Sequence, residues 1–359
     1  MKVLEVISNL EPAGGGETFA VNICRELASM CELKVVILYS KYRQYFVDRL
    51  KEKGIEPIVL DKRKHFDLKN AKELRQIIND FKPDVIHTEN NALIPTYLAL
   101  RKTKYRKTLK VFHTMHLDPK DECPNFILNM LFKHILRKKN YIPVAITKLL
   151  SELSSKHYGV PYVPYINNGT DLEPFSSSKT LAERRYDIAV VGRFSKEKNH
   201  KFLISAFAEL HKQIPNLKVA LVGGGELFDS IKDLAIQHDA LDYVEFKGIM
   251  NYPAEVVNDS KIILLGSLFE ANPLSLLEGM SSGCIVVSTN VGGVPDIIKE
   301  GKNGFLYNVD DLGKFLEITT KILDNINDYQ SMSDYNVSYS KNFSMRRCAQ
   351  EYLDLFIKQ

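Results

Sequence analysis

The sequence has few cysteines, no long apolar run and no export signal, and each absence excludes a class of protein. Its five cysteines are scattered and odd in number, without metal-ligand spacing, which argues against a zinc site or a disulfide framework and is typical of a reducing compartment. No apolar run approaches the ~18 residues of a membrane-spanning helix. The first ten residues, MKVLEVISNL, contain one lysine and no cleavage site, so we interpret them as a strand. We therefore expect a cytoplasmic protein, and 359 residues favour two domains.

Positive charge is concentrated in the first half of the chain. Residues 1–170 contain 28 Lys+Arg and 18 Asp+Glu, a net charge of +10, whereas residues 171–359 carry −6. Much of the excess lies in residues 101–110 and 132–141, and the second cluster follows the apolar run FILNMLF. Such a basic amphipathic segment favours peripheral contact with the anionic inner face of a membrane; a solvated basic face is the alternative. Nucleic acid is disfavoured because aromatic residues do not interleave with the charges.

Short apolar, β-branched runs alternate with helical patterns throughout the chain. KVLEVIS, LKVVILY, IEPIVL, PDVIHT and LKVFHT predict strands in the first half, and YDIAVVG, LKVALVG, YVEFKG, KIILLG and CIVVST predict strands in the second. This alternation indicates α/β domains with parallel, doubly wound sheets and helices on both faces. The polar segment between the halves, residues 167–185, has the composition of a linker. Ligands of such sheets bind beyond the carboxyl ends of the strands, so two facing domains predict a cleft.

The segment SLFEANPLSLLEGMSSG, residues 267–283, places two carboxylates between two apolar strands. The pattern predicts a loop with Glu270, then a helix whose first residue is Pro273 and that ends at Gly283. Glu270 would then lie at the ligand edge of the sheet, and Glu278 about a turn and a half into the helix. Carboxylates there are good acceptors for sugar hydroxyls. The alternative is that both side chains are simply exposed to solvent.

Cationic and glycine-rich segments follow other strands of the second half. VVGRFSKEKN places Arg193 and Lys198 directly after a strand, where both can bind phosphate. LVGGGE, which contains Gly223, allows a ligand to approach the backbone closely. The free N–H groups at the start of the helix predicted from Pro273 form a further anion site. The candidate residues at that helix start are Asn272, Pro273, Leu274 and Ser275.

The first half offers a matching loop. SNLEPAGGGETFAVNI follows the first strand, and its glycines 14–16 precede a helix that we expect to begin at Thr18. The spacing is neither that of a dinucleotide site nor that of a P-loop. Gly15 and Gly16 would still let backbone N–H groups approach a diphosphate.

Two histidines, His113 and His116, end another strand of the first half, in VFHTMHLD. Their spacing raises the possibility of a metal, but no third ligand is evident and no Asp-x-Asp occurs in the chain. We therefore expect no metal and no cofactor. A histidine that hydrogen-bonds to a ligand in the cleft is the favoured interpretation, and a packed structural histidine is the alternative for either one.

Taken together, these segments resemble the retaining glycosyltransferases of family 4, which have the GT-B fold. The resemblance covers nearly the whole chain and is carried by GGGE, TMH, INNGTD, GRFSKEKN, VGGGE and, most specifically, FEANPLSLLEGMSSGCIVVSTNVGGVPDII with its Glu-x7-Glu spacing. It implies an acceptor domain over residues 1–166, a linker over 167–185 and a donor domain over 186–343. A C-terminal helix at about 344–359 would pack back on the first domain.

The resemblance also implies a role for each candidate residue. Glu278 would hold the ribose of the nucleotide, and Glu270 a hydroxyl of the donor sugar. Arg193 and Lys198 would neutralise the diphosphate, helped by the amides at Gly16 and at residues 272–275.

The resemblance does not identify the donor sugar. His116, in its Thr-x-His setting, fits the donor-sugar histidine of the family better than His113 does. Where the family commonly has Gly-Phe or Gly-Leu after the first glutamate of the block, this chain has Ala271 and Asn272. Those positions touch the donor sugar, so its identity does not follow from the resemblance.

The expected function is therefore transfer of a hexose-type sugar from a nucleoside diphosphate, most often UDP in the family, to a glycan or lipid-linked acceptor. A surface polysaccharide is the expected product. Three alternatives remain: a nucleotide-sugar epimerase, a phosphorylase of the same fold, and a non-catalytic glycosyltransferase-like partner subunit. The Glu, Arg and Lys residues that such partner subunits usually lose are present here.

Overall fold

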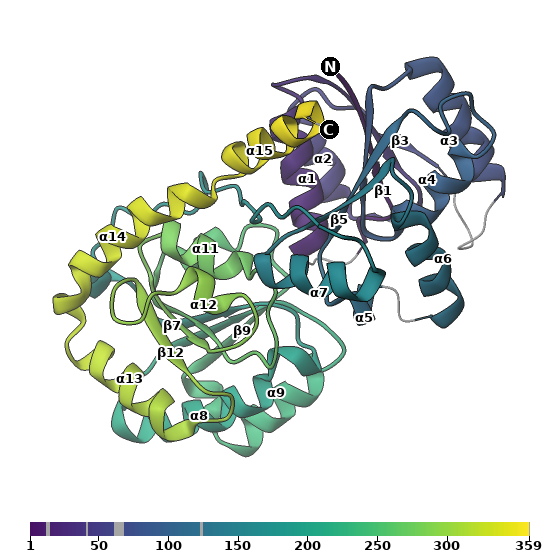
Figure 1. Cartoon of the computed structure of the whole chain (residues 1–359). Coiled ribbons are helices and arrows are strands. Elements are labelled where there is room, and N and C mark those ends of the chain that lie inside the picture. The colour runs from purple at the N-terminus through teal and green to yellow at the C-terminus, as the bar shows by residue number, and fades with distance from the viewer. Residues whose placement is uncertain (12–14, 41, 61–67, 123–124, 359) are drawn as a thin grey trace. The chain divides into compact units, whose positions relative to one another are not determined.

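The computed structural model describes residues 1–11, 15–40, 42–60, 68–122 and 125–358, and it divides into two units with one parallel sheet each (Figure 1). Residues Met1–Gly169 and Met345–Gln359 form the first unit, and Thr170–Ser344 form the second. Gly14 of the predicted glycine loop and Cys123 lie outside the described residues. Within the described ranges, no helix combines the length and apolar character that crossing a bilayer requires.

The first unit is built on six parallel strands in the order β3-β2-β1-β4-β5-β6. Its strands are β1 (Lys2–Ile7), β2 (Glu32–Ile37), β3 (Ile58–Val59), β4 (Val85–Glu89), β5 (Lys110–Met115) and β6 (Tyr141–Ala145). Its helices are α1 (Gly15–Leu27), α2 (Gln44–Lys51), α3 (Leu68–Phe81), α4 (Leu93–Leu100), α5 (Pro119–Glu122), α6 (Phe126–Leu136), α7 (Lys148–Tyr158) and α15 (Met345–Lys358), with the 3-10 turn η1 (Asn90–Ala92).

Helices cover both faces of this sheet, because its strands are apolar on both sides. In β1, Leu4 and Val6 pack in one core, with residues of α3, α4 and α6. Val3 lies in the core on the other face, with residues of α1 and α15. Burying a large apolar side chain contributes about 1.5–3 kcal/mol, so these two cores fix the order of the layers.

The C-terminal helix α15 belongs to the first unit although about half of the chain separates it from the rest. Tyr352 and Phe356 are buried, and the Phe356 ring lies 4.7 Å from that of Phe112 in β5. The Tyr352 hydroxyl is 3.0 Å from Thr114 Oγ1. One face of the first sheet is therefore completed by the last residues of the sequence.

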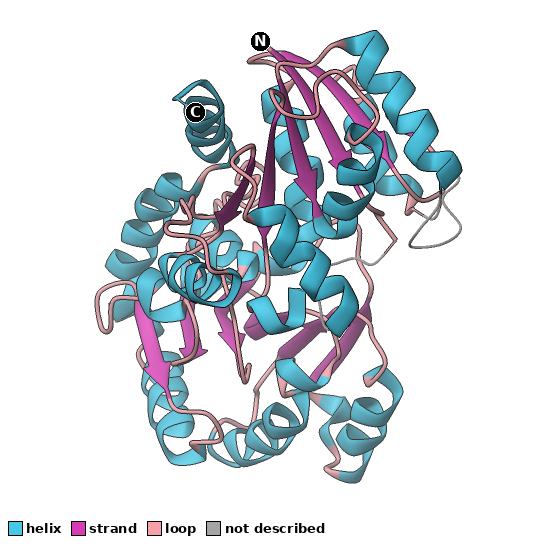
Figure 2. Ribbon diagram, turned by 45° about the vertical axis from the view of Figure 1, so that its right-hand side comes forward, coloured by secondary structure: helices cyan, strands magenta, loops and turns pink. Residues whose placement is uncertain are grey.

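The second unit repeats the arrangement, with strand order β12-β11-β10-β7-β8-β9 and helices on both faces (Figure 2). Its strands are β7 (Tyr186–Val191), β8 (Val219–Val222), β9 (Val244–Gly248), β10 (Ser260–Leu265), β11 (Ile285–Thr289) and β12 (Gly304–Tyr307). Its helices are α8 (His200–Gln213), α9 (Phe228–Gln237), α10 (Ala254–Val257), α11 (Leu274–Ser281), α12 (Val294–Ile297), α13 (Leu312–Asp324) and α14 (Gln330–Ser340). Its 3-10 turns are η2 (Leu181–Glu183), η3 (Lys196–Lys198), η4 (Ala240–Asp242), η5 (Ile326–Tyr329) and η6 (Lys341–Phe343).

Both sheets have the doubly wound order in which the chain reverses direction beside the first strand, which confirms the fold class predicted from the sequence. The reversal lies between β1 and β4 in the first unit and between β7 and β10 in the second. Loops that leave the carboxyl ends of these strand pairs diverge, and ligands of such folds bind there.

The segment predicted as a linker is packed against the second unit from Thr170 onward. Phe175 and Leu181 are buried in its two cores. Arg184 is buried and donates hydrogen bonds to the carbonyl oxygens of Ser260 and Ser282. The polar segment is therefore a surface segment held to the second unit by a few buried side chains. Its polar composition alone does not reveal these contacts.

Candidate active site

An ion pair joins the loops that follow β7 and β10, the strands at the switch point of the second sheet. Lys198 ends η3, and Glu270 lies between β10 and α11. Lys198 Nζ is 2.6 Å from Glu270 Oε1, and the Ser267 hydroxyl donates to the same oxygen at 2.6 Å. The Glu270 side chain is 8% exposed and that of Lys198 24%. An ammonium has three N–H donors, so a partly exposed Lys198 held by one carboxylate can still donate to a ligand.

The glycine-rich turn after β11 packs against the backbone of the Glu270 loop. Gly293 N–H donates to the Glu270 carbonyl oxygen at 2.9 Å. Gly292 has φ +53°, and a Cβ added there would collide with the same carbonyl group. The glycines of NVGGVPD are therefore needed for contact between two loops.

Helix α11 begins at Leu274, one residue later than predicted. Pro273 has extended backbone geometry (φ −74°, ψ 107°) and occupies the N-cap position. Its fixed φ suits both positions, so the sequence alone could not separate them. Gly283, with φ +75°, ends the helix as predicted. The N–H groups of Leu274 and Ser275 lie in the first turn, where no intrahelical acceptor is available.

Glu278 is buried on α11 rather than exposed on the helix surface, with 9% of the residue accessible. The Thr170 hydroxyl donates to its Oε1 at 3.2 Å. Asn272, before the helix, is also 9% exposed, and no partner for its buried Oδ1 is found among the described residues. Asn272 before α11 and Glu278 within it are thus both buried polar residues.

Arg193 and Gly223 lie in the loops after β7 and β8. Arg193 is exposed and precedes the buried Phe194. Gly223, with φ +141°, is close to the backbone of Gly192, with whose carbonyl oxygen an added Cβ would collide. Gly223 therefore allows close contact between two loops of the protein, and its approach to a ligand stays a prediction.

In the first unit, α1 begins at Gly15 rather than at Thr18, so Gly15 and Gly16 form its first turn. A Cβ on Gly16 would lie 3.0 Å from Asn90 Oδ1 and 3.9 Å from the ring of His116. Asn90 follows β4, across the switch point from β1. Glycine here lets the helix start, the loop after β4 and His116 lie close together.

The two histidines of VFHTMHLD have different environments. His113 is inaccessible to solvent, and its Nδ1 is 2.9 Å from the Thr88 hydroxyl. Its ring packs edge-on against Phe132, and burial lowers the pKa of His113 to about 3. The side chain of His116 is 10% exposed. His113 is therefore a neutral core residue, and His116 is the one that can reach solvent.

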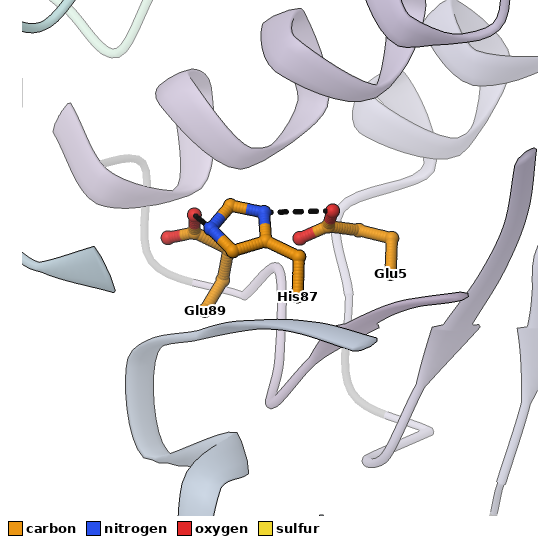
Figure 3. A group of neighbouring side chains, drawn as sticks. All are labelled: Glu5, His87 and Glu89. Atoms are coloured by element: carbon orange, nitrogen blue, oxygen red, sulfur yellow. Dashed lines mark hydrogen bonds and ion pairs between the residues drawn. The ribbon is translucent and has the colours of Figure 1, made fainter. Parts of the chain in front are cut away.

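A buried acidic and imidazole cluster, Glu5, His87 and Glu89, escaped the sequence analysis (Figure 3). The signal was present: each is a charged or titratable residue inside an apolar strand pattern, KVLEVI or VIHTE. In the described part of the chain this is the one group whose ligand atoms, all within 4.8 Å, suit a metal. However, both ring nitrogens of His87 are engaged, by Glu5 at 2.9 Å and by Thr114 at 2.8 Å. The arrangement therefore fits a hydrogen-bonded network better than a metal site.

Comparisons with known proteins agree with this architecture. The family described as "Glycosyltransferase Family 4" matches residues 13–174, and "Glycosyl transferases group 1" matches residues 173–338. An uncharacterized glycosyltransferase of Haemophilus influenzae is 22% identical over 351 residues, which are 96% of this chain and 97% of that protein.

A second relative and a solved structure extend the comparison. The UDP-Gal:alpha-D-GlcNAc-diphosphoundecaprenol alpha-1,3-galactosyltransferase of Escherichia coli is 24% identical over 334 residues, 86% of this chain and 81% of that protein. The crystal structure of Anabaena HepE in complex with UDP and glucose has a TM-score of 0.83 at 16% identity and covers 100% of both chains.

Proposed function

Because the chain belongs to the family-4 glycosyltransferases and is a nucleotide-sugar-dependent enzyme of the GT-B fold, we propose that it transfers a hexose from UDP with retention of configuration and without a metal. The observation that carries the proposal is the Lys198–Glu270 pair at the switch point of the second sheet, next to the start of α11. It combines a cation, a carboxylate and free backbone N–H groups at the edge where such folds bind nucleotides.

The proposed chemistry follows from where charge develops. Breaking the bond between sugar and phosphate builds negative charge on the UDP leaving group and positive charge on the sugar ring. Lys198, Arg193 and the first N–H groups of α11 are donors suited to the diphosphate, and each well-placed donor contributes on the order of 3 kcal/mol. The leaving diphosphate needs no general acid, and its phosphate oxygen can accept the proton of the attacking acceptor hydroxyl.

Two carboxylates are proposed to bind hydroxyl groups of the donor. Glu278, buried on α11, would accept from the ribose, and Glu270 from the sugar that is transferred. In the first unit, Gly16 and His116 lie close together, and we propose that they contact the sugar nucleotide. Asn272 Oδ1, for which the described residues provide no partner, would be a further acceptor for the sugar.

A membrane-borne acceptor is supported by the surface of α6. Phe126, Ile127 and Met130 at its start are 77%, 75% and 60% exposed, and basic residues follow within the same helix and just beyond it. An exposed apolar cluster beside cations suits the surface of an anionic bilayer. The E. coli relative is named for a lipid-linked acceptor, GlcNAc-diphosphoundecaprenol. A lipid-linked intermediate of a surface glycan is the proposed acceptor class.

Thermal shifts with UDP, GDP and ADP test the donor site. A ligand at 100 times its Kd adds about 2.7 kcal/mol to the stability, which raises the melting temperature by a few degrees. We expect a shift with UDP that Glu278→Gln abolishes and that EDTA does not affect. The absence of a shift with all three nucleotides would contradict the proposal.

Product stereochemistry and vesicle flotation test the remaining parts. The anomeric coupling constant of the product should be that of the donor, and an inverted centre would exclude a retaining enzyme. The triple variant F126S/I127S/M130S should lose flotation with phosphatidylglycerol vesicles. Ile236→Ser, which removes an exposed apolar side chain from α9, should not. Equal flotation of both variants would remove the support for a membrane-borne acceptor.

A further inference from the structure

Four acidic and imidazole side chains alternate in a row through the first unit. Glu5 lies on β1, His87 and Glu89 lie on β4, and His116 follows β5. Glu5 Oε2 is 2.9 Å from His87 Nδ1, and His87 Nε2 is 3.3 Å from Glu89 Oε1. Glu89 Oε2 is 2.6 Å from His116 Nε2. The row thus begins in the core and ends at the one member that is accessible to solvent (Figure 3 shows the first three).

Glu5, His87 and Glu89 are completely buried, so solvent cannot stabilise their charges. Any charge on one of them has to be balanced by a hydrogen bond or an opposite charge within the row. Thr114 Oγ1 anchors His87 at 2.8 Å and is itself 3.0 Å from the hydroxyl of Tyr352 on α15. These contacts fix the ring of His87 from two sides. Glu89 is therefore placed by β4 and by a rigid neighbour, and it presents one carboxylate oxygen to His116.

His113 shows what burial does to a histidine of the same strand region whose Nε2 is 3.9 Å from the carboxylate of Glu122 and therefore beyond hydrogen-bond distance. Burial lowers the pKa of His113 to about 3, and this ring is neutral. At His116 burial also disfavours the charged ring, but the charge and the hydrogen bond of Glu89 outweigh it and raise the pKa of His116. In turn, His116 lowers the pKa of Glu89 against the effect of burial. The pair is therefore an ion pair, imidazolium and carboxylate.

The other titratable groups that face His116 do not reverse this conclusion. Glu122 on α5 and Glu17 on α1 both favour the protonated ring through their charges. The neighbouring His113 is neutral, and the ring of Phe19 packs edge-on against His116 at 5.3 Å. Each element around His116 thus contributes an acidic, neutral or aromatic group.

We propose that Glu89 is a positioning residue that keeps His116 protonated and directs its Nδ1–H, as a charged donor, toward an oxygen atom of the bound sugar nucleotide. The Glu89 carboxylate holds Nε2–H, and within the described part of the chain no group is hydrogen-bonded to Nδ1. A charge-assisted hydrogen bond is roughly twice as strong as a neutral one. This role rests on the proposed function, because it assigns the ligand of His116 to the sugar nucleotide.

The decisive variant is Glu89→Gln, which keeps the shape of the side chain and removes its charge. Loss of the carboxylate should let His116 release its proton at a pH lower by about one unit or more. The measurement is the ring NMR titration of His116 in the full-length protein with labelled histidine, assigned with His116→Asn. Glu5→Gln, a substitution of equal burial that does not touch His116, should move this titration much less.

The alkaline limb of kcat/KM supplies the second readout. Because the protonated ring is the active form, activity should fall as the pH rises through the pKa of His116, and Glu89→Gln should move that limb to lower pH by the NMR shift. An unchanged NMR titration in Glu89→Gln would overturn the role of Glu89. A shifted titration with an unmoved limb would overturn the charged-donor role of His116.

Glu89→Asp covers the case in which the glutamine variant does not fold. It keeps the charge but shortens the side chain, so His116 should titrate above its ordinary value while kcat/KM falls at every pH. Titration at or below the ordinary value would overturn the proposal. A chain without transferase activity would refute the proposed function but would still show the NMR shifts, so the two failures can be told apart.

Discussion

Lys198 and Glu270, from loops on either side of the switch point of the second sheet, form an ion pair with 2.6 Å between Nζ and Oε1. The loops are also joined through their backbones, since Leu268 N–H donates to the Glu197 carbonyl oxygen at 2.7 Å. If Lys198 binds phosphate as proposed, the Glu270 carboxylate beside it repels that anion. It also holds the ammonium in one place before the ligand arrives, which lowers the entropic cost of binding. The pair therefore holds the Lys198 ammonium in one position beside the Glu270 carboxylate, as the proposed diphosphate and sugar contacts require.

Lys198→Ala should lower kcat by about 100-fold, because in the proposed mechanism it removes one donor to the charge that develops on the leaving diphosphate. The acceptor KM should change little, since the proposed role of Lys198 is on the donor side. Steady-state kinetics with both substrates varied measure the two effects separately. Lys196→Ala, an exposed lysine of the same short helix, is the control and should behave like the wild type. A parallel loss of kcat, acceptor affinity and melting temperature would point to a folding defect instead.

Gly292→Ala should destabilise the Glu270 loop by more than its backbone strain alone. Its φ of +53° and the collision of a Cβ with the Glu270 carbonyl both oppose alanine. Gly301 isolates the first effect, because its φ is +71° and no atom lies within 4 Å of an added Cβ. We expect Gly301→Ala to cost about 1 kcal/mol, and Gly292→Ala to cost more and to weaken UDP-sugar binding. Urea unfolding and donor titration of the two variants make the comparison, and equal losses would mean that Gly292 does not support Glu270.

The sequence predicted ten of the strands, and the two that it missed each have a physical cause. β6 (YIPVA) contains Pro143, which cannot donate to a ladder, and it is an edge strand that follows a basic cluster. β12 (GFLY) has four residues, begins with glycine and is also an edge strand. β3 and β9 are edge strands as well and were predicted, so the proline of β6 and the short length and initial glycine of β12 are what hid these two.

The site residues that could be predicted are those that the strand order alone brings together. Lys198 and Glu270 follow strands whose carboxyl ends are adjacent, and topology alone suffices to bring such residues together. The hydrogen bond of Glu278 to Thr170 was not predictable, because Thr170 comes from the segment expected to be a linker. The Glu89–His116 pair depends on the register of β4 and β5, which no local pattern specifies.

Gly16→Ala should affect the donor site without lowering stability. In the first turn of α1 alanine favours the helix by up to about 1 kcal/mol over glycine, but its methyl group would lie 3.0 Å from Asn90 Oδ1. Asn90 must then move, and we expect the donor KM to rise by about tenfold with an unchanged or higher melting temperature. Gly313→Ala is the matched control, since Gly313 also lies in the first turn of a helix and the nearest atom to its Cβ is 3.8 Å away. An unchanged donor KM in Gly16→Ala would show that this space is not used by the donor.

Glu122→Gln should reduce the loss of stability between pH 5 and pH 8. Burial raises the pKa of Glu122 from 4.5 to about 7, although the charge of His116 opposes the shift. Between these values the folded state binds more protons than the unfolded state, so stability falls as the pH rises, by at most about 3 kcal/mol. Glutamine removes this titration and can still accept from Leu117 N–H, which Glu122 now accepts at 3.0 Å. Melting temperatures at pH 5 and pH 8 should therefore differ less in Glu122→Gln than in the wild type. Glu152→Gln, an exposed position on α7, should keep the wild-type difference, and the same difference in both variants would refute the burial cost assigned to Glu122.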